Sequence, residues 1–386
     1  MAGESTFSKM KHTAYVVIVA AFVFMLFLPL LQMTFKIFPE IPSGENRSLA
    51  IRPKLEKPSL VALRQYQKEF EPYFNDNYGF RNILVRINGI LNIKLFGFSS
   101  SKRVVLGGDG WLFYNDENDG VSFKDFQGEA AFSSEELTKI KRNILFMDQQ
   151  LRGKGIQFVV ILAPNKHTIY PEYLPSSVRI NTGAKTRADQ LATILAGSDL
   201  NYIDLRSTLI DAKANYSMPL YFKTDTHWNE QGALIAYNKI IEELQKHDTK
   251  HNELQAEIVS LRAVPNGGLG DMAGFLNLKN ALSDENVIVS DISPQRHPVS
   301  SISPYSGKSD VVMEIPASKL PRLLVFRDSF FEALLPFICQ QFSRSVYLWQ
   351  NTIDLNIIDK EKPDIVIFEF VERYSQCLLG LPNPPI

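Results

Sequence analysis

Residues 321–331 read Pro-Arg-Leu-Leu-Val-Phe-Arg-Asp-Ser-Phe-Phe, and this stretch indicates the fold more directly than any other. Residues 323–326 form a continuous apolar run, which is typical of a buried parallel strand. Ser329 follows, and the apolar pattern of residues 330–342 predicts a helix. A serine at such a strand-to-helix turn projects its hydroxyl at the C-terminal edge of the sheet, where open α/β sheets bind ligands. The plain alternative is a serine that only caps the helix.

The same alternation of strand and helix patterns continues on both sides of this stretch. Strands are predicted at residues 157–162, 202–205, 346–349 and 365–370, and helices at residues 185–196 and 229–247. This rhythm predicts an α/β fold with a mainly parallel sheet and helices on both faces. Residues 250–320 carry weaker signals and are interpreted as an insertion or a lid.

Three local patterns predict further elements before the first of these strands. They are a helical region at residues 59–96 broken at Asn77-Tyr78-Gly79, a hairpin at residues 104–114, and a helix that runs from a Ser133–Glu136 capping box to about Arg152. They belong to the same outer region of the chain as the α/β pattern.

Composition excludes several classes of protein. The 386 residues include 41 Lys and Arg against 42 Asp and Glu, so a general nucleic-acid binder is not expected. Only two cysteines are present, Cys339 and Cys377, which excludes a disulfide-rich scaffold and a multi-cysteine metal site. The histidines show no ligand spacing, so neither a metal nor a cofactor is expected.

The N-terminus has the composition of a membrane span. Residues 13–35 carry no charge and, at about 1.5 Å per residue, cross about 30 Å of hydrocarbon. No small-x-small cleavage site follows, so an uncleaved anchor is favoured over a signal peptide or a buried core helix. Lys9 and Lys11 precede the span, which predicts cytoplasmic residues 1–12.

The remainder of the chain is then expected outside the membrane, in the periplasm if the source is a bacterium. The proline-rich residues 36–58 are predicted to be a linker, and residues 59–386 to be one periplasmic domain. The predicted location is therefore a single-pass protein of the bacterial inner membrane, with its folded domain in the periplasm.

A second chemical motif is Thr224-Asp225-Thr226-His227-Trp228-Asn229. In an extended loop, side chains two residues apart point the same way. A carboxylate at Asp225 can then fix the tautomer of His227 and stabilise its imidazolium. The alternative is a solvated polar loop before the helix at residue 229.

A third motif is Ala163-Pro164-Asn165-Lys166, with Tyr170 soon after, at the end of the strand predicted at residues 157–162. Asn165 can donate its amide N–H to an oxyanion, and Lys166 can hold an anionic substrate group. A polar turn is the equal alternative. Together the three motifs supply a nucleophile, a base, its orienting carboxylate and an oxyanion donor, which are the groups that acyl transfer needs.

With these motifs, the sequence resembles the SGNH hydrolase-like O-acetyltransferases of bacterial exopolysaccharide assembly, such as the periplasmic alginate O-acetylation proteins. The resemblance covers nearly all of the outer part, in the motifs at residues 45–50, 77–81, 108–114, 164–166, 225–228, 270–273, 327–330 and 372–374. It implies a flavodoxin-like SGNH fold, with Ser329 as nucleophile, His227 as base and Asp225 as its orienting carboxylate. The chain order Asp, His, Ser looks circularly permuted relative to ordinary SGNH esterases.

The resemblance also implies a function and partners. Acetyl would pass through Ser329 to hydroxyls of an exported polysaccharide, and the donor would be a multi-pass membrane O-acyltransferase. Other exopolysaccharide export proteins are further implied partners. Two alternatives stay open, a silent polysaccharide-binding scaffold and a carbohydrate acetyl esterase. Tyr170, Trp228 and Phe330 are candidates to stack on sugar rings, with core packing as the equal alternative. Lys166 and Arg327 are candidates to bind sugar carboxylates if the polymer is a uronate, with ordinary ion pairs as the equal alternative.

Overall fold

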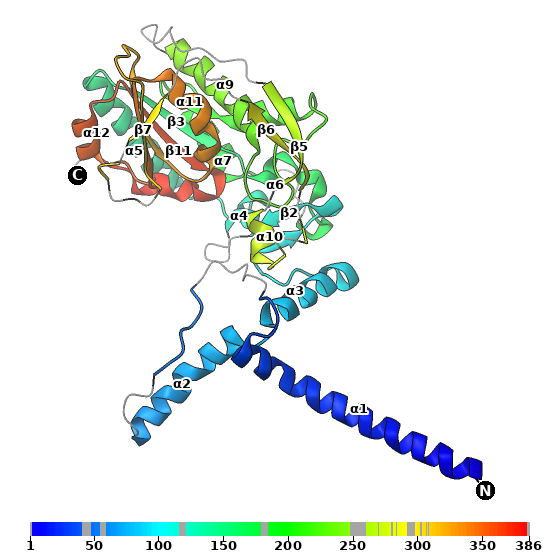
Figure 1. The fold of residues 1–386 in the computed structure, drawn as a ribbon. Helices are drawn as coiled ribbons and strands as arrows, with labels where there is room; N and C mark the ends of the chain where they lie inside the picture. Colours follow the sequence, from blue (N-terminus) through cyan, green and yellow to red (C-terminus); the bar gives the residue numbers. More distant parts are fainter. Residues whose placement is uncertain are drawn as a thin grey trace. The chain divides into compact units, whose positions relative to one another are not determined.

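The structure is a computed structural model. It describes residues 2–40, 48–54, 59–115, 121–178, 184–247, 260–268, 270–278, 281–282, 284–291, 298–301, 303–305, 307 and 309–383. The chain forms two compact units (Figure 1), Met1–Ser100 with Gly274–Ala281 and Ser101–Ala273 with Leu282–Ile386. Residues 41–47 and 55–58 of the predicted linker lie outside the described residues.

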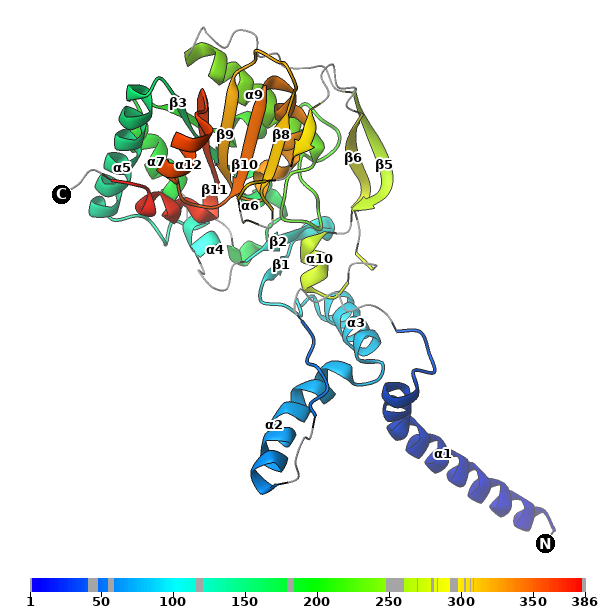
Figure 2. The same ribbon diagram turned by 60° about the vertical axis from the view of Figure 1, so that its left-hand side comes forward.

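The second unit is built on a seven-stranded sheet (Figure 2). Its strand order is β4 (Asn201–Asp204), β3 (Gln157–Ala163), β11 (Ile365–Val371), β9 (Arg322–Arg327), β10 (Arg344–Trp349), β8 (Val311–Glu314) and β7 (Val299–Ser301). The first five strands are parallel, and β8 and β7 are antiparallel to their neighbours. The parallel strands therefore end at one edge.

Helices cover both faces of this sheet because successive strand residues face opposite sides. Val159 and Ile161 of β3 belong to one hydrophobic core, and Val160 and Leu162 belong to the other. The first core is completed by α8 (Leu205–Lys213) and α9 (Glu230–His247), and the second by α5 (Ser134–Gly153), α7 (Arg187–Leu195) and α12 (Leu355–Glu361). The predicted α/β class is confirmed, and the circular permutation stays a prediction.

The helix predicted at residues 330–342 is wrong in detail. The chain forms a 3-10 turn at Phe330–Leu334, a short α11 at Leu335–Ile338 and a second 3-10 turn at Cys339–Gln341. Pro336 lies within this segment and has no backbone N–H to donate, which disfavours one continuous helix. Both cysteines are free thiols.

The interpretation of residues 250–320 as an insertion or lid needs correction. Strands β7 and β8 from this stretch are part of the main sheet. The other described elements are a two-stranded sheet of β5 (Ser260–Gly268) and β6 (Asp284–Asp291), and helix α10 (Asp271–Phe275). The part of this region that contains β7 and β8 therefore belongs to the main sheet.

The second unit also contains shorter elements outside the main sheet. They are the predicted hairpin of β1 (Val104–Leu106) and β2 (Leu112–Tyr114), α4 (Val121–Phe126) and α6 (Lys166–Ile169). The capping box at Ser133 and Glu136 begins α5 as predicted. Both local predictions are confirmed.

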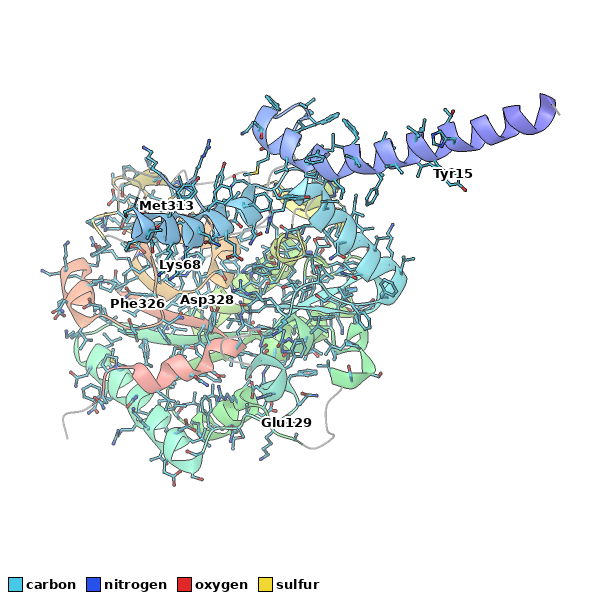
Figure 3. The ribbon with its side chains drawn as sticks, turned by 90° about the horizontal axis from the view of Figure 1, so that it is seen from below. Tyr15, Lys68, Glu129, Met313, Phe326 and Asp328 are labelled. Atoms are coloured by element: carbon cyan, nitrogen blue, oxygen red, sulfur yellow. The ribbon has the colours of Figure 1, made fainter. Side chains whose placement is uncertain are left out.

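The first unit contains α1 (Ala2–Phe35), α2 (Leu60–Asn77), α3 (Arg81–Leu91) and a π-helical turn at Asn92–Phe96. The break between α2 and α3 falls where it is predicted. Within α1, His12–Phe35 is long and apolar enough to cross a membrane. The side chains of that segment are largely exposed, as Figure 3 shows at Tyr15.

Candidate active site

Ser329 lies two residues beyond Arg327, the C-terminal end of β9. Figure 3 labels Phe326 and Asp328 of the same stretch. The Ser329 side chain makes no capping hydrogen bond, and its Oγ lies 2.8 Å from Nε2 of His227. The turn is held by the buried Asp328 carboxylate, which accepts hydrogen bonds from the N–H groups of Phe330 and Val371, each at 2.8 Å. Asp328 thereby joins the ends of β9 and β11.

His227 and Asp225 lie on the loop between α8 and α9. Nδ1 of His227 is 2.6 Å from Oδ1 of Asp225, so the imidazole bridges that carboxylate and the Ser329 hydroxyl. The His227 side chain is 28% exposed, which leaves it reachable from solvent. Burial alone raises the pKa of Asp225, but the hydrogen bond and charge of His227 and two backbone N–H donors outweigh it and lower the pKa to about 2.

Asp271, at the start of α10, fixes the orientation of Asp225. Its backbone N–H donates to Oδ2 of Asp225 at 2.8 Å, and its carboxylate accepts from the N–H and hydroxyl of Thr226 at 2.8 and 2.7 Å. Gly270 allows this close approach, because a Cβ there would lie 1.9 Å from the Thr224 carbonyl oxygen. Part of the stretch predicted as a lid therefore supports the site.

Lys166 holds the same loop from inside the fold. Its ammonium donates to the carbonyl oxygens of Phe222, Lys223 and Asp225 at 3.0, 3.0 and 2.6 Å. Burial is the main cause that lowers its pKa to about 7. With these donors used and the side chain buried, Lys166 is not placed to hold a substrate anion.

Arg327 is likewise a buried cation. Its guanidinium donates to the carbonyl oxygens of Asp328 and Ser309 and lies over the Trp349 ring at 4.8 Å. Only 1% of the residue is exposed, so its position does not offer a charge to a sugar carboxylate. It instead supports the backbone that leads into Ser329.

The three aromatic candidates for sugar stacking are also inside the fold. Trp228 and Phe330 are 1% and 0% exposed, and the indole N–H of Trp228 donates to the Phe330 carbonyl oxygen at 3.0 Å. Tyr170 is 4% exposed, and its hydroxyl accepts from the Leu220 N–H. Trp228 and Phe330 thus join the loop that carries His227 to the turn that carries Ser329, and none of the three rings offers an open face to a sugar.

Asn165 is connected to the site through Arg373, for which the sequence pattern predicts no role. The Arg373 guanidinium donates to Oδ1 of Asn165 at 3.1 Å and lies 5.2 Å from the centre of the Phe330 ring. That ring in turn lies 4.9 Å from the imidazole of His227. Asn165 is thus connected to His227 through two intervening side chains, Arg373 and Phe330.

Two buried glutamates were also not predicted. Glu372 accepts from the Asn165 N–H and the Thr168 hydroxyl, each at 2.6 Å, and burial raises its pKa to about 7. Glu369 accepts from the Asp328 N–H at 3.0 Å, and burial raises its pKa well above the ordinary value. The sequence offered one signal for these two residues. Glu369 lies inside the apolar stretch 365–371, and Glu372 follows directly after it.

Asp225, His227 and Asp271 also have the composition of a metal site, since one ligand atom from each lies within 4.8 Å of the others. In this structure those atoms have other partners. The Asp225 oxygens bind the imidazole and the Asp271 N–H, and the Asp271 oxygens bind Thr226. The arrangement is satisfied by hydrogen bonds alone.

A Ser–His–Asp hydrogen-bonded chain at the carboxyl edge of a parallel α/β sheet is an arrangement that several classes of serine hydrolase share. The profile of the family described as "SGNH hydrolase-like domain, acetyltransferase AlgX" matches residues 104–306, just over half of the sequence. The chain belongs to this family.

Individual relatives agree with the family match. The chain is 27% identical over 184 residues to a protein of Pseudomonas fluorescens named "Probable alginate O-acetylase AlgJ", covering 46% of this chain and 42% of the relative. It is 26% identical over 223 residues to the protein of that name from Pseudomonas putida, covering 56% and 53%. The matches span about half the length of these relatives.

The fold has a solved counterpart. A structure of Bacillus cereus PatB1 with a sulfonyl adduct superposes with a TM-score of 0.50 at 19% identity, covering 70% of this chain and 96% of that one. At this identity the likeness supports the fold alone.

Proposed function

We propose that this chain is a membrane-anchored O-acetyltransferase that transfers acetyl through Ser329 to hydroxyl groups of an exported polysaccharide. The observation that carries the proposal is the continuous hydrogen-bonded chain from Asp225 through His227 to Ser329. Membership of the acetyltransferase family and the names of the relatives support the choice of acetyl and polysaccharide.

In the first half-reaction, the Ser329 hydroxyl attacks the carbonyl carbon of an acetyl ester. His227 takes the hydroxyl proton at Nε2 and returns it to the departing alcohol, which leaves an acetyl–serine ester. In the second half-reaction, His227 takes a proton from a sugar hydroxyl as its oxygen attacks that ester. The proton then passes to Ser329 Oγ as the acetylated sugar leaves. Asp225 stabilises the imidazolium in both steps.

The tetrahedral intermediates need hydrogen-bond donors for the oxyanion. The backbone N–H of Ser329 suits this role, because it has no acceptor within the part of the chain that the structure describes. Asn165 is proposed as a second donor. Its Oδ1 faces Arg373, which leaves the amide NH₂ for another partner.

The proposed setting is the bacterial inner membrane, with α1 as a single-pass anchor, residues 1–12 in the cytoplasm, and residues 36–58 linking it to a periplasmic domain. A multi-pass membrane O-acyltransferase would supply acetyl to that side, and exopolysaccharide export proteins would present the acceptor. Alginate, which the relatives' names specify, is the first acceptor to test.

The nucleophile can be tested by mass spectrometry after treatment of the purified protein with a sulfonyl fluoride. We expect one adduct on the peptide that contains Ser329, none in Ser329→Ala, and an unchanged adduct in Ser134→Ala, which removes an exposed serine. For Asp225→Asn, acetyl-ester turnover should fall on the order of 10⁴-fold. An adduct that persists in Ser329→Ala would refute the assignment.

The direction of the reaction is decided by the acceptor. A transferase should release the leaving alcohol faster when oligosaccharide is added and should produce acetylated sugar. Release to water at a rate that the acceptor does not change would identify an esterase. Glycan binding with no ester turnover would identify a scaffold.

A further inference from the structure

Helix α3 and the turn after it have an apolar face with no partner among the described residues. Leu84, Ile87 and Leu91 are 50%, 48% and 45% exposed, and Leu95 and Phe98 are each 68% exposed. The first four follow one another at three- and four-residue steps, so they form one stripe along the helix.

The opposite side of α3 is already packed. Gly89 is buried, and a Cβ there would lie 3.4 Å from the Leu276 carbonyl oxygen and 3.5 Å from a methyl group of Leu278. At 100° per residue, Gly89 points away from Leu84, Ile87 and Leu91. The exposed stripe is therefore a separate face of α3 that this packing leaves exposed.

The charge of this region is one-sided. Residues 81–103 contain Arg81, Arg86, Lys94, Lys102 and Arg103 and no acidic residue, in a chain whose net charge is −1. A helix that combines an apolar face with basic residues is typical of segments that lie in the headgroup region of a membrane and are attracted to anionic lipids.

Contacts within the first unit fasten the start of α3 to the end of α1. A Cβ at Gly79 would lie 2.1 Å from the Pro29 carbonyl oxygen, and the rings of Phe38 and Phe80 are 5.7 Å apart. Gln32 also exchanges two hydrogen bonds with the backbone of Phe38, at 2.8 and 2.9 Å. At about 1.5 Å per residue, the apolar segment of α1 exceeds the hydrocarbon thickness of about 30 Å. In the proposed anchor, the end of this segment, beside which α3 begins, would therefore lie near the membrane surface.

We propose that α3 and residues 92–98 bind the membrane surface, with the Leu84–Ile87–Leu91–Leu95 stripe in the boundary between headgroups and acyl chains and the basic residues at anionic headgroups. This inference depends on the membrane anchor proposed above. The bound surface would hold the first unit against the bilayer by a second contact besides α1.

The test uses the full chain reconstituted in vesicles, with an environment-sensitive fluorophore on one introduced cysteine and spin-labelled lipid as quencher. The labelled variants are Leu91→Cys on the stripe, Tyr15→Cys within α1 and Glu135→Cys on the exposed start of α5. Wild type measures background labelling of the native cysteines. We expect quenching at positions 15 and 91, none at 135, and stronger quenching at 91 when phosphatidylglycerol is added to phosphatidylcholine.

Quenching at position 15 without quenching at 91 would overturn the inference and would point to a protein partner for the stripe. Absence of quenching at position 15 would overturn the anchor and the inference with it. The combined variant Arg86→Glu and Lys94→Glu should remove the dependence on phosphatidylglycerol, and an unchanged dependence would contradict the role of charge. Sulfonyl adduct formation at Ser329 in the same samples reports the proposed function separately.

Discussion

Glu369 shows how a single buried residue can support the turn that carries Ser329. It lies in β11 with no exposed surface, and one oxygen accepts the Asp328 N–H while Oε1 has no partner in the described structure. Burial, and then the neighbouring charge of Asp328, raise the pKa of Glu369 well above its ordinary value, which favours the neutral acid.

Two substitutions separate the hydrogen bond of Glu369 from its charge. Glu369→Gln keeps a neutral acceptor, so we expect a change of at most about 1 kcal/mol in the free energy of unfolding and nearly normal sulfonylation of Ser329. Glu369→Ala leaves the buried Asp328 N–H unpaired, and we expect a loss of about 1–3 kcal/mol and slower sulfonylation. Denaturant unfolding and adduct kinetics measure both. Equal effects of the two variants would contradict a neutral glutamate.

At this scale the sequence predicted the residues of the hydrogen-bonded chain better than those around them. Asp225, His227 and Ser329 could be proposed because strand ends meet at one edge and side chains two apart share a side. The burial of Lys166 and Arg327 could not be predicted from the sequence. It depends on backbone carbonyl groups that loops distant in the sequence bring to these two side chains.

The N-terminus of α5 offers a prediction about one element. The Ser133 side chain accepts from the Glu136 N–H and completes a capping box. Ser133→Ala should therefore lower the free energy of unfolding by about 1 kcal/mol. Ser134→Ala, one residue into the helix, is the matched control and should have little effect. A null result for Ser133→Ala in denaturant titrations would argue against the cap.

A substitution at Gly270 tests the contact between α10 and the loop that carries Asp225 and His227. A methyl group at this position would overlap the Thr224 carbonyl oxygen, so Gly270→Ala should displace Asp271 and lower both stability and acetyl-ester turnover. Gly153→Ala is the control, because nothing lies within 4 Å of its Cβ position. The loss of turnover should be at least about tenfold, as expected for a disturbed positioning contact. Normal turnover in Gly270→Ala would exclude this support of the site.

Elements were predictable where the local pattern matches the final packing. The apolar runs of β3, β9 and β11 are buried on both faces, so composition alone indicates them. Helix α8 was missed because it begins at Leu205, directly after β4, with no intervening turn residues. Strand β8 is only four residues long, and its place depends on pairing with the distant β10.

Across the whole molecule, buried carboxyl groups determine how stability depends on pH. Burial raises the pKa of Asp125 to about 6 and that of Glu372 to about 7, from ordinary values of 3.8 and 4.5. A group that is harder to ionise when folded stabilises the fold below its unfolded pKa, and this contribution is lost as pH rises through the folded pKa. Asp225 has a lowered pKa of about 2, so its contribution is already complete by pH 5.

We therefore expect the free energy of unfolding to fall as pH rises from 5 to 7.5, with Glu372 contributing on the order of 2–3 kcal/mol of the fall. Lys166 has the opposite effect on the free energy of unfolding, but only above about pH 7. Its folded pKa is lowered to about 7, so above that pH the folded protein loses this proton before the unfolded chain does. Glu372→Gln cannot ionise, so its stability should depend less on pH than that of wild type in denaturant titrations. Glu129→Gln, at an exposed position, is the control and should keep the wild-type slope. If Glu372→Gln keeps that slope as well, Glu372 ionises normally in the folded protein, and the pH dependence comes from the other buried carboxyl groups with raised pKa values, Asp125, Asp271 and Glu369.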